Sequence, residues 1–256
     1  DPLGGSWFVE SLTDELARAG WAFFQEIEAA GGVLAALGSG LVAERTAAVR
    51  AGREAGVATR RVPITGVSEF PHLQEKPVER AGRPQVPTSG AGGLPVHRPA
   101  AVYEAYRDRS DAVLAATRRR PRAFLATLGP LAEYTARAGF ARNLLAAGGI
   151  ETPEAGPTTT AEEVAAAFAE AGTPVAVLCS TDDTYRERGE QTVAALRAAG
   201  ARSVLLAGKV RVPGVDGQLF AGCDALAVIE RVHAALDGAA PDRAGGAPET
   251  DAEAAT

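Results

Sequence analysis

Apolar residues recur at three- and four-residue steps near the start of the chain, which is the spacing of one face of an α-helix. The residues on this face are Leu12, Leu16, Ala19, Phe23 and Ile27. Ser11 to Asp14 has the polar pattern of a capping box, and Gly31-Gly32 interrupts the apolar spacing. The pattern therefore predicts an amphipathic helix from Ser11 to Gly31.

A second helix and a short strand are predicted next. Alanine and valine alternate with charged residues from Leu41 to Gly52, which favours a helix, and the apolar run from Val62 to Val67 favours a strand. Each element leaves an apolar face to be covered, and a segment of roughly 70 residues buries too little surface for independent stability. We expect this first segment to pack against further protein.

The middle of the chain is rich in proline and glycine. From His72 to Pro99, prolines with fixed φ angles and no amide donor flank the glycine-rich stretch from Ser89 to Gly93. This composition predicts a connector without regular structure, followed by one helix from Ala100 to Thr117. The basic run from Arg118 to Arg122 is typical of a solvated helix end that complements the helix dipole, and contact with a phosphate group is the alternative.

After Pro121 the pattern changes to apolar strands that alternate with alanine-rich helices. The predicted strands are Ala123–Leu128, Val175–Leu178 and Ser203–Ala207, and the predicted helices are Tyr134–Ala147, Ala161–Ala171 and Arg186–Ala199. Continuous apolar strands between helices indicate an open parallel sheet covered on both faces, of the flavodoxin or Rossmann-like α/β class. Such sheets bind ligands beyond the carboxyl ends of their strands. The candidate loops are Leu128–Tyr134, Cys179–Asp183 and Gly208–Pro213.

Composition agrees with a globular protein and narrows the function classes. The 256 residues are 46% hydrophobic, and the net charge of −6 is spread along the sequence, which argues against a nucleic-acid or membrane surface. Neither a secretory signal nor a membrane-length apolar run is present, so we expect a cytoplasmic protein. Cys179 and Cys223 lie in apolar stretches typical of buried free thiols. Since methionine is absent even at position 1, we expect a fragment of a longer reading frame.

Two motifs give a more specific reading. The chain opens with Asp1-Pro2-Leu3-Gly4-Gly5-Ser6-Trp7-Phe8-Val9-Glu10-Ser11-Leu12-Thr13, which resembles a signature of acyl-CoA mutases of the methylmalonyl type. The segment Ile64-Thr65-Gly66-Val67-Ser68-Glu69-Phe70-Pro71 resembles the last barrel strand of the small subunit in that family, whereas the large catalytic subunit typically has a VGVN-like strand there.

The resemblance implies a domain order for the whole chain. Residues 1–71 would be the C-terminal part of the mutase TIM barrel, and residues 72–120 a Pro/Gly-rich linker with one helix. Residues 121–237 would form a cobalamin-binding-like α/β domain, and residues 238–256, which are small, polar and acidic, a disordered tail. The expected fold class is therefore α/β, a TIM-barrel remnant followed by a parallel-sheet domain.

The resemblance also locates the positions that decide whether cobalamin is bound. The family's DxHxxG motif, whose histidine ligates cobalt, aligns with Leu131 at the aspartate, Glu133 at the histidine and Ala136 at the glycine. A hard carboxylate is a poor substitute for an imidazole oriented by a neighbouring acid. His72 and His97 lie in the linker and His233 lies far along the chain, so we read all three as surface or packing residues. No metal site is expected.

Two further segments agree with this loss. Ser180 alone could still donate a hydrogen bond where the family has a Ser-Ser-Leu type segment, and Gly208-Lys209 stands where an Ala-Gly-Gly segment normally passes the cofactor's nucleotide tail. Lys209 adds a side chain there. Asp182 and Asp183 could suggest a magnesium or phosphoacceptor site, but paired acids commonly open a helix.

One dinucleotide-like pattern remains to be weighed. Gly38 to Ala43 fits GxGxxA, but it lies between two helical patterns and is read as a helix connector. No nucleophile constellation or zinc-binding helix motif is found in the sequence, so no catalytic residue is expected in this chain.

The leading hypothesis is a non-catalytic small subunit of a heterodimeric methylmalonyl-CoA mutase. As the resemblance implies, the large subunit would bind adenosylcobalamin and interconvert (R)-methylmalonyl-CoA and succinyl-CoA, while this chain binds none. Two alternatives stay open: a catalytic acyl-CoA mutase chain with a divergent cobalamin site, and a generic Rossmann-like module for another small ligand.

Overall fold

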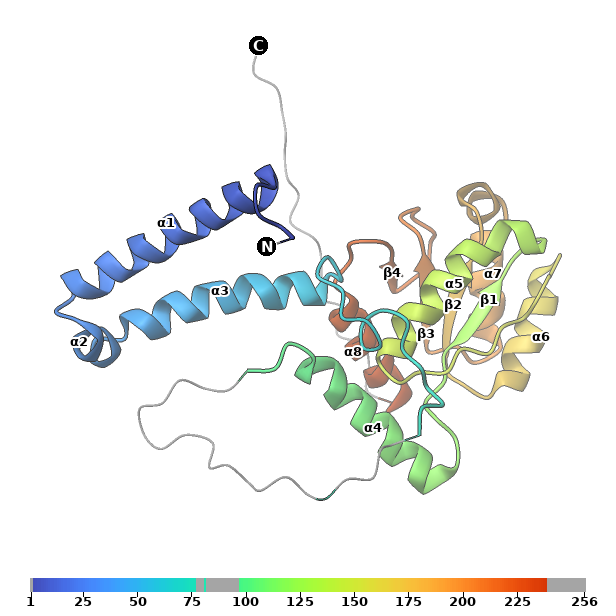
Figure 1. Ribbon diagram of the computed structural model, residues 1–256. Coiled ribbons are helices and arrows are strands. Elements are labelled where there is room, and N and C mark those ends of the chain that lie inside the picture. The colour runs from blue at the N-terminus through green and yellow to red at the C-terminus, as the bar shows by residue number, and fades with distance from the viewer. Residues whose placement is uncertain (1, 77–80, 82–96, 239–256) are drawn as a thin grey trace, which may run out of the picture. The chain divides into compact units, whose positions relative to one another are not determined.

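A computed structural model describes residues 2–76, 81 and 97–238. The chain divides into two compact units, whose described parts are residues 2–54 and residues 55–76, 81 and 97–238. The predicted disordered tail and most of the predicted connector lie outside the described residues. Each unit is treated by itself below (Figure 1).

The first unit is helical. It contains α1 (Trp7–Ala29), α2 (Val33–Gly38) and most of α3 (Leu41–Ala58). Glu26 of α1 accepts from Arg45 of α3 at 2.7 Å, which joins the two long helices. The stretch that fits GxGxxA connects α2 to α3, in agreement with its interpretation as a helix connector.

The predicted start of α1 at Ser11 is wrong, because the helix begins one turn earlier, at Trp7. Ser6 is the N-cap without a side-chain hydrogen bond, and the Glu10 carboxylate accepts from Gly5 N at 3.1 Å. Thr13, read as part of a capping box, instead donates its hydroxyl to Val9 O at 2.7 Å inside the helix.

Residues 62–67 do not form the predicted strand. The segment folds into a turn in which Ser68 N donates to Ile64 O at 2.9 Å, while the Ser68 hydroxyl accepts from Ile64 N at 2.9 Å. A strand needs a neighbour for its amide and carbonyl groups. Among the described residues this segment has only an isolated bridge between Thr65 and Glu69. The turn forms hydrogen bonds with these amide and carbonyl groups locally, so the apolar composition of residues 62–67 did not indicate a strand.

The second unit is built on a parallel sheet. Its described strands are β1 (Phe124–Thr127), β2 (Val175–Cys179), β3 (Ser203–Ala207) and β4 (Gly217–Leu219), in the order β1-β2-β3-β4. Every residue of β1, β2 and β3 is buried, as the continuous apolar runs predict. β4 was not predicted.

A further segment runs parallel to the free side of β1. In this edge segment (residues 151–155), Glu151 O accepts from Ala123 N at 3.0 Å and Pro153 O accepts from Leu125 N at 2.8 Å. Including it, the spatial order is edge segment, β1, β2, β3, β4, which is the flavodoxin-like order. The switch point of this order lies at the carboxyl ends of β1 and β2.

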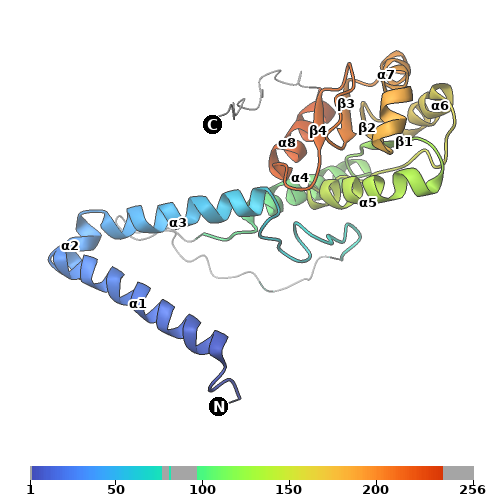
Figure 2. The same ribbon diagram turned by 90° about the horizontal axis from the view of Figure 1, so that it is seen from above.

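Helices cover both faces of the sheet (Figures 1 and 2). They are α4 (Ala101–Thr117), α5 (Leu131–Ala147), α6 (Ala161–Ala171), α7 (Asp182–Ala198) and α8 (Ala225–Leu236). Side chains of α5 and α8 form one apolar core with the sheet, joined by Tyr103 of α4, and side chains of α6 and α7 form the other. The expected α/β parallel-sheet class is confirmed.

Two helices of the α/β unit are longer at their N-terminal ends than the sequence predicts. α5 and α7 each begin several residues before the predicted Tyr134 and Arg186. Thr181 caps α7 by accepting from Thr184 N at 3.2 Å, a signal that the sequence does contain. In α6 a complete capping box joins Thr160 and Glu163.

The basic run after α4 is only partly solvated. Arg118 is the left-handed C-cap of α4 and is exposed. Arg120 is buried and pairs with Asp111 at 2.5 Å, and Arg122 pairs with Glu151 at 3.2 Å. The interpretation of the run as a solvated helix end is therefore wrong for Arg120, which is buried, whereas Arg122 is half-buried and keeps contact with solvent.

Candidate functional site

The carboxyl ends of the parallel strands meet at one edge of the sheet, where the sequence placed the candidate residues. Ser180 follows β2 and is fully buried. Its hydroxyl donates to Leu128 O, after β1, at 2.8 Å. The Ser180 hydroxyl thus joins the two loops of the switch point, and its donor is used inside the protein.

Glu133 lies in the first turn of α5, where the resemblance places the cobalt-ligating histidine. Its Oε2 accepts from Thr184 Oγ1 at 2.8 Å, and Thr184 Oγ1 lies 2.8 Å from Thr181 Oγ1. Gly129, at φ +84°, lies so close to Oε2 that a Cβ at this position would collide with the carboxylate. The Glu133 carboxylate therefore joins α5 to the start of α7.

Leu131 and Ala136 stand at the family's aspartate and glycine positions, and both are exposed on α5. Neither has a polar side-chain atom that could orient a ligand. The candidate loop Leu128–Tyr134 is shorter than expected, since α5 begins directly after Pro130. Good helix formers follow the proline, and Glu133 in the first turn complements the helix dipole.

Tyr185 of α7 fills the space between the ends of β2 and β3. The residue is 1% exposed, and its hydroxyl accepts from Ser180 N at 2.8 Å. The same hydroxyl lies 3.0 Å from Leu178 O and 2.9 Å from Ala207 O. Burial raises the pKa of the Tyr185 hydroxyl, so it stays a neutral donor at physiological pH.

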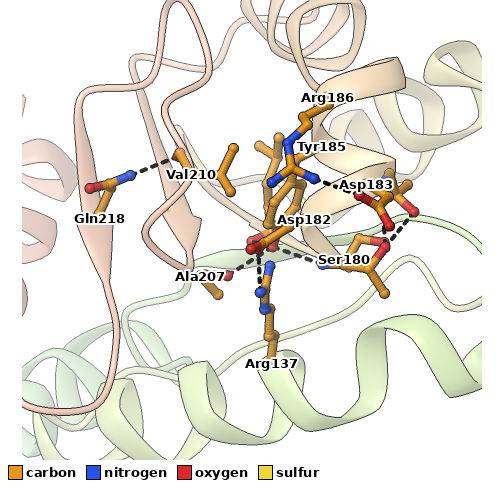
Figure 3. A network of polar contacts seen from close by, with 12 residues as sticks. Arg137, Ser180, Asp182, Asp183, Tyr185, Arg186, Ala207, Val210 and Gln218 are labelled. Carbon is orange, nitrogen blue, oxygen red and sulfur yellow. Dashed lines mark hydrogen bonds and ion pairs between the residues drawn. The ribbon is translucent and has the colours of Figure 1, made fainter.

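Arg137 of α5 closes this region from the other side (Figure 3). Its Nη2 donates to Asp182 at 2.5 Å, and its guanidinium lies 5.1 Å from the centre of the Tyr185 ring. Gly208 has φ +147°, and a Cβ there would come within 3.0 Å of Arg137 Nη1. A side chain at Gly208 is therefore disfavoured, because this φ is rare for residues with a Cβ and the end of the Arg137 side chain would have to shift.

Lys209, the other residue predicted at this loop, is exposed. Its Nζ lies 4.7 Å from the centre of the Phe220 ring, beyond β4. The candidate loops after β1, β2 and β3 lie at one edge of the sheet, as predicted, because the three strands pair in parallel.

The two aspartates of α7 have ordinary helix-start partners. Asp182 binds Arg137, and Asp183 binds Arg186 at 2.5 Å. Thr181, not an aspartate, is the N-cap. Among residues 2–76, 81 and 97–238, no group of three or more His, Cys, Asp or Glu side chains gathers into a metal-binding geometry.

The remaining titratable candidates are packing residues or exposed. Cys179 is buried and Cys223 is half-buried, and burial raises the pKa of both thiols. His233 is buried, with its Nε2 2.9 Å from Gly148 O, which confirms a packing role. His72 and His97 are exposed. Within the part of the chain that the structure describes, no helix has the length and hydropathy that a membrane crossing requires.

Comparison with known proteins gives the family. The family model for methylmalonyl-CoA mutase matches residues 1–89. Over 229 residues the chain is 54% identical to the methylmalonyl-CoA mutase small subunit of Streptomyces virginiae, an alignment that covers 90% of this chain and 37% of that protein. The chain belongs to the methylmalonyl-CoA mutase family.

Two further relatives of this mutase family carry similar names. A probable methylmalonyl-CoA mutase small subunit of Mycobacterium tuberculosis is 50% identical over 215 residues, covering 84% of this chain and 33% of that protein. The methylmalonyl-CoA mutase small subunit of Propionibacterium freudenreichii subsp. shermanii is 38% identical over 246 residues, covering 93% and 37%. The chain therefore spans about a third of the length of the curated relatives it matches.

The protein's own side chains occupy the switch point. The residue at the histidine position is a carboxylate already bonded to Thr184, and the space beside Gly208 is taken by Arg137. Sequence reasoning identified Glu133 but missed Tyr185 and Arg137. The available signal was the spacing of residues on α7, where Tyr185, Gly189, Thr192 and Leu196 fall on one buried face.

Proposed function

We propose that this chain works as part of the small, non-catalytic subunit of a heterodimeric methylmalonyl-CoA mutase. The large subunit would bind adenosylcobalamin and interconvert (R)-methylmalonyl-CoA and succinyl-CoA. The α/β domain of this chain would support that subunit without holding a cofactor. The names and the extent of the alignments to small-subunit relatives support the proposal.

The observation that carries the non-binding part of the proposal is the environment of Glu133. An axial cobalt ligand must present a lone pair to the metal, and the ordinary ligand for this position is an imidazole. The Glu133 carboxylate instead accepts from Thr184 Oγ1 at 2.8 Å across the gap between α5 and α7. The buried Tyr185 hydroxyl lies within hydrogen-bond distance of Leu178 O and Ala207 O, at the ends of β2 and β3. This packing supports the proposal that side chains fill the switch point.

Exposed apolar side chains of the first unit support an interaction role. Trp7 is 92% exposed, Phe8 75% and Leu34 83%, although each is large and apolar. Trp7 and Phe8 are neighbours at the start of α1, and exposed apolar groups that lie together mark interaction sites. As part of the same proposal, residues 1–71 belong to a mutase barrel, in keeping with the family match to residues 1–89. Residues 72–120 would link this part to the α/β domain of residues 121–237.

A cobalamin titration tests the non-binding claim. The purified chain is titrated with adenosylcobalamin and with hydroxocobalamin, and the ultraviolet–visible spectrum is followed. We expect the spectrum of free cobalamin throughout. A base-off spectrum with a histidine ligand and micromolar affinity contradicts the proposal.

A variant that restores the family motif distinguishes two possible causes of non-binding: the missing motif residues and the packing of Tyr185 and Arg137 at the strand ends. The triple substitution Leu131→Asp, Glu133→His and Ala136→Gly restores the family motif. We expect it to remain without cobalamin, because Tyr185 and Arg137 still occupy the strand ends. Tight binding by this variant would show that the motif loss alone prevents binding.

Co-purification tests the partner. The chain, carried in the full small subunit, is expressed with a tagged large subunit from the same organism. We expect a one-to-one complex with mutase activity. Failure of two folded subunits to associate counts against the proposed role.

A further inference from the structure

The segment that follows α3, here named the strap (residues 60–70), has an unusual backbone conformation at both ends. Arg60 has φ +58° and Phe70 has φ +52°, in the left-handed region that residues with a side chain rarely adopt. Among the described residues, Arg118 is the only other non-glycine residue with a positive φ. Such conformations persist only where their surroundings hold them, and they gather at switch regions. The contacts at the two ends of the strap therefore decide whether it stays closed.

One side chain of α5 bonds to the end of the strap. Asn143 Oδ1 accepts from Phe70 N at 3.0 Å, and Asn143 Nδ2 donates to Glu69 Oε2 at 2.6 Å. Glu69 Oε1 in turn accepts from Arg60 Nη2 at 2.6 Å, which joins the two ends of the strap to each other. Removing the Asn143 side chain therefore removes two hydrogen bonds that fix the strap to α5.

The apolar side chains of the strap bury only part of their surface. Ile64 and Val67 are half-buried and pack against the apolar core to which Leu144 of α5 belongs. Val62 is 49% exposed and Phe70 is 78% exposed. Because the hydrophobic contribution grows with the apolar area removed from water, these four side chains give the closed strap limited stability.

Packing at the Arg60 end of the strap is incomplete. The Arg60 side chain is 8% exposed, and its Nε and Nη1 are buried without a hydrogen-bond partner among the described residues. A cavity of about 120 Å³ adjoins this end, lined by Arg60, Glu69, Phe140 and Cys223, among others. Buried donors without acceptors and unfilled space both raise the free energy of the closed strap.

We propose that the strap opens from α5 as a unit while the parallel sheet stays folded. Segments with few buried contacts open at a lower free energy than the whole domain unfolds. In the open strap, Arg60 and Phe70 return to ordinary backbone angles and the Arg60 guanidinium is solvated. The apolar surface beside α5 that Ile64 and Val67 cover is then exposed. The strap is thus a cover that controls access to this apolar surface.

Hydrogen exchange of the purified chain measures this opening. Mass spectrometry follows peptides that report residues 62–70 and, for comparison, β2. We expect the strap amides to exchange more slowly than in an unfolded peptide of the same sequence, and about a hundredfold faster than the β2 amides. A common rate for both segments contradicts the proposal, because the strap would then open only with global unfolding. Unprotected strap amides also contradict it, because the strap would then not close.

Two variants are expected to change the opening in opposite directions. Asn143→Ala removes both hydrogen bonds to the strap, and we expect the strap amides to exchange about tenfold faster. Phe70→Asn introduces a residue that tolerates the left-handed conformation, and we expect the strap amides to exchange about threefold slower. The Phe70 side chain is 78% exposed, so this second variant loses little packing.

Arg142→Gln is the matched control, because Arg142 adjoins Asn143 on α5 but pairs with Glu154, outside the strap. We expect unchanged strap exchange in this variant and unchanged β2 exchange in all three. If Asn143→Ala unfolds the whole unit, Phe70→Asn decides the question alone. Equal effects of Asn143→Ala and Arg142→Gln overturn the proposal, as does faster strap exchange in Phe70→Asn. None of these results depends on the proposed mutase role, because the test requires only the folded chain.

Discussion

Helices α1 and α8 both carry an apolar face, but only that of α8 is covered. In α8, Ile229 and Val232 are fully buried against the sheet. None of the residues of α1, all of which the structure describes, is buried, and Trp7 and Leu16 are 92% and 63% exposed. The spacing of apolar residues specifies the helix and its face, whereas coverage depends on what lies opposite. The face of α1 is therefore a surface suited to contact further protein.

The largest expected effect is the loss of stability when a buried apolar side chain is truncated, compared with an exposed one. Leu205→Ala in β3 removes a side chain that is 1% exposed, and we expect it to destabilise the α/β unit by about 2–5 kcal/mol. Leu16→Ala in α1 is expected to change stability by less than about 0.5 kcal/mol. Urea unfolding followed by far-ultraviolet circular dichroism reports the helices of both units, so a loss caused by either variant is measured. Equal losses would contradict the contrast between buried and exposed faces.

The next largest expected effect is a loss of stability when the Tyr185 hydroxyl at the ends of β2 and β3 is removed. Tyr185→Phe leaves the amide of Ser180 without its acceptor and removes the hydroxyl beside Leu178 O and Ala207 O. We expect a loss of about 1–3 kcal/mol, because buried polar groups without partners are costly. Tyr106→Phe is the matched control, since Tyr106 is half-buried and contacts His233 through its ring. Similar losses in the two variants would show that the Tyr185 hydroxyl does not hold the strand ends.

The smallest effect is a pH dependence from His233. Burial lowers the pKa of this imidazole, against the opposing effect of Gly148 O. The unfolded chain therefore binds a proton that the folded unit does not, so stability is full above about pH 6.5 and falls as the pH drops below it. Denaturation midpoints between pH 7.5 and pH 5.5 are compared for the parent chain, His233→Gln and the exposed control His72→Gln. We expect only His233→Gln to reduce the slope; an unchanged slope argues against a buried neutral imidazole.

The sequence specified the middle of the sheet well and its margins poorly. β1, β2 and β3 are buried on both faces, and continuous apolar runs identify such strands. β4 has only Leu219 buried, so a three-residue strand left no pattern to recognise. Residues 62–67 had the composition of a strand, but strand formation also requires a neighbour, which no local pattern encodes.

The same distinction holds for the candidate site. Glu133 could be found by alignment to a motif, because that argument uses position along the chain alone. Arg137 and Tyr185 come together only after α5 and α7 pack on the sheet, at a sequence separation that no local pattern spans. The cavity lined by Arg60, Phe140 and Cys223 combines the end of α3, α5 and the loop after β4, and finding it required the tertiary structure for the same reason.

The edge segment has a consequence for how this chain associates with other proteins. The edge segment carries the charged residues Glu151 and Glu154, and β4 at the other side of the sheet has only three residues. Both margins are thus poor templates for adding a strand, which disfavours edge-to-edge aggregation. Association with another protein is directed to helical surfaces and loops, where side chains rather than backbone amides decide which partner is accepted.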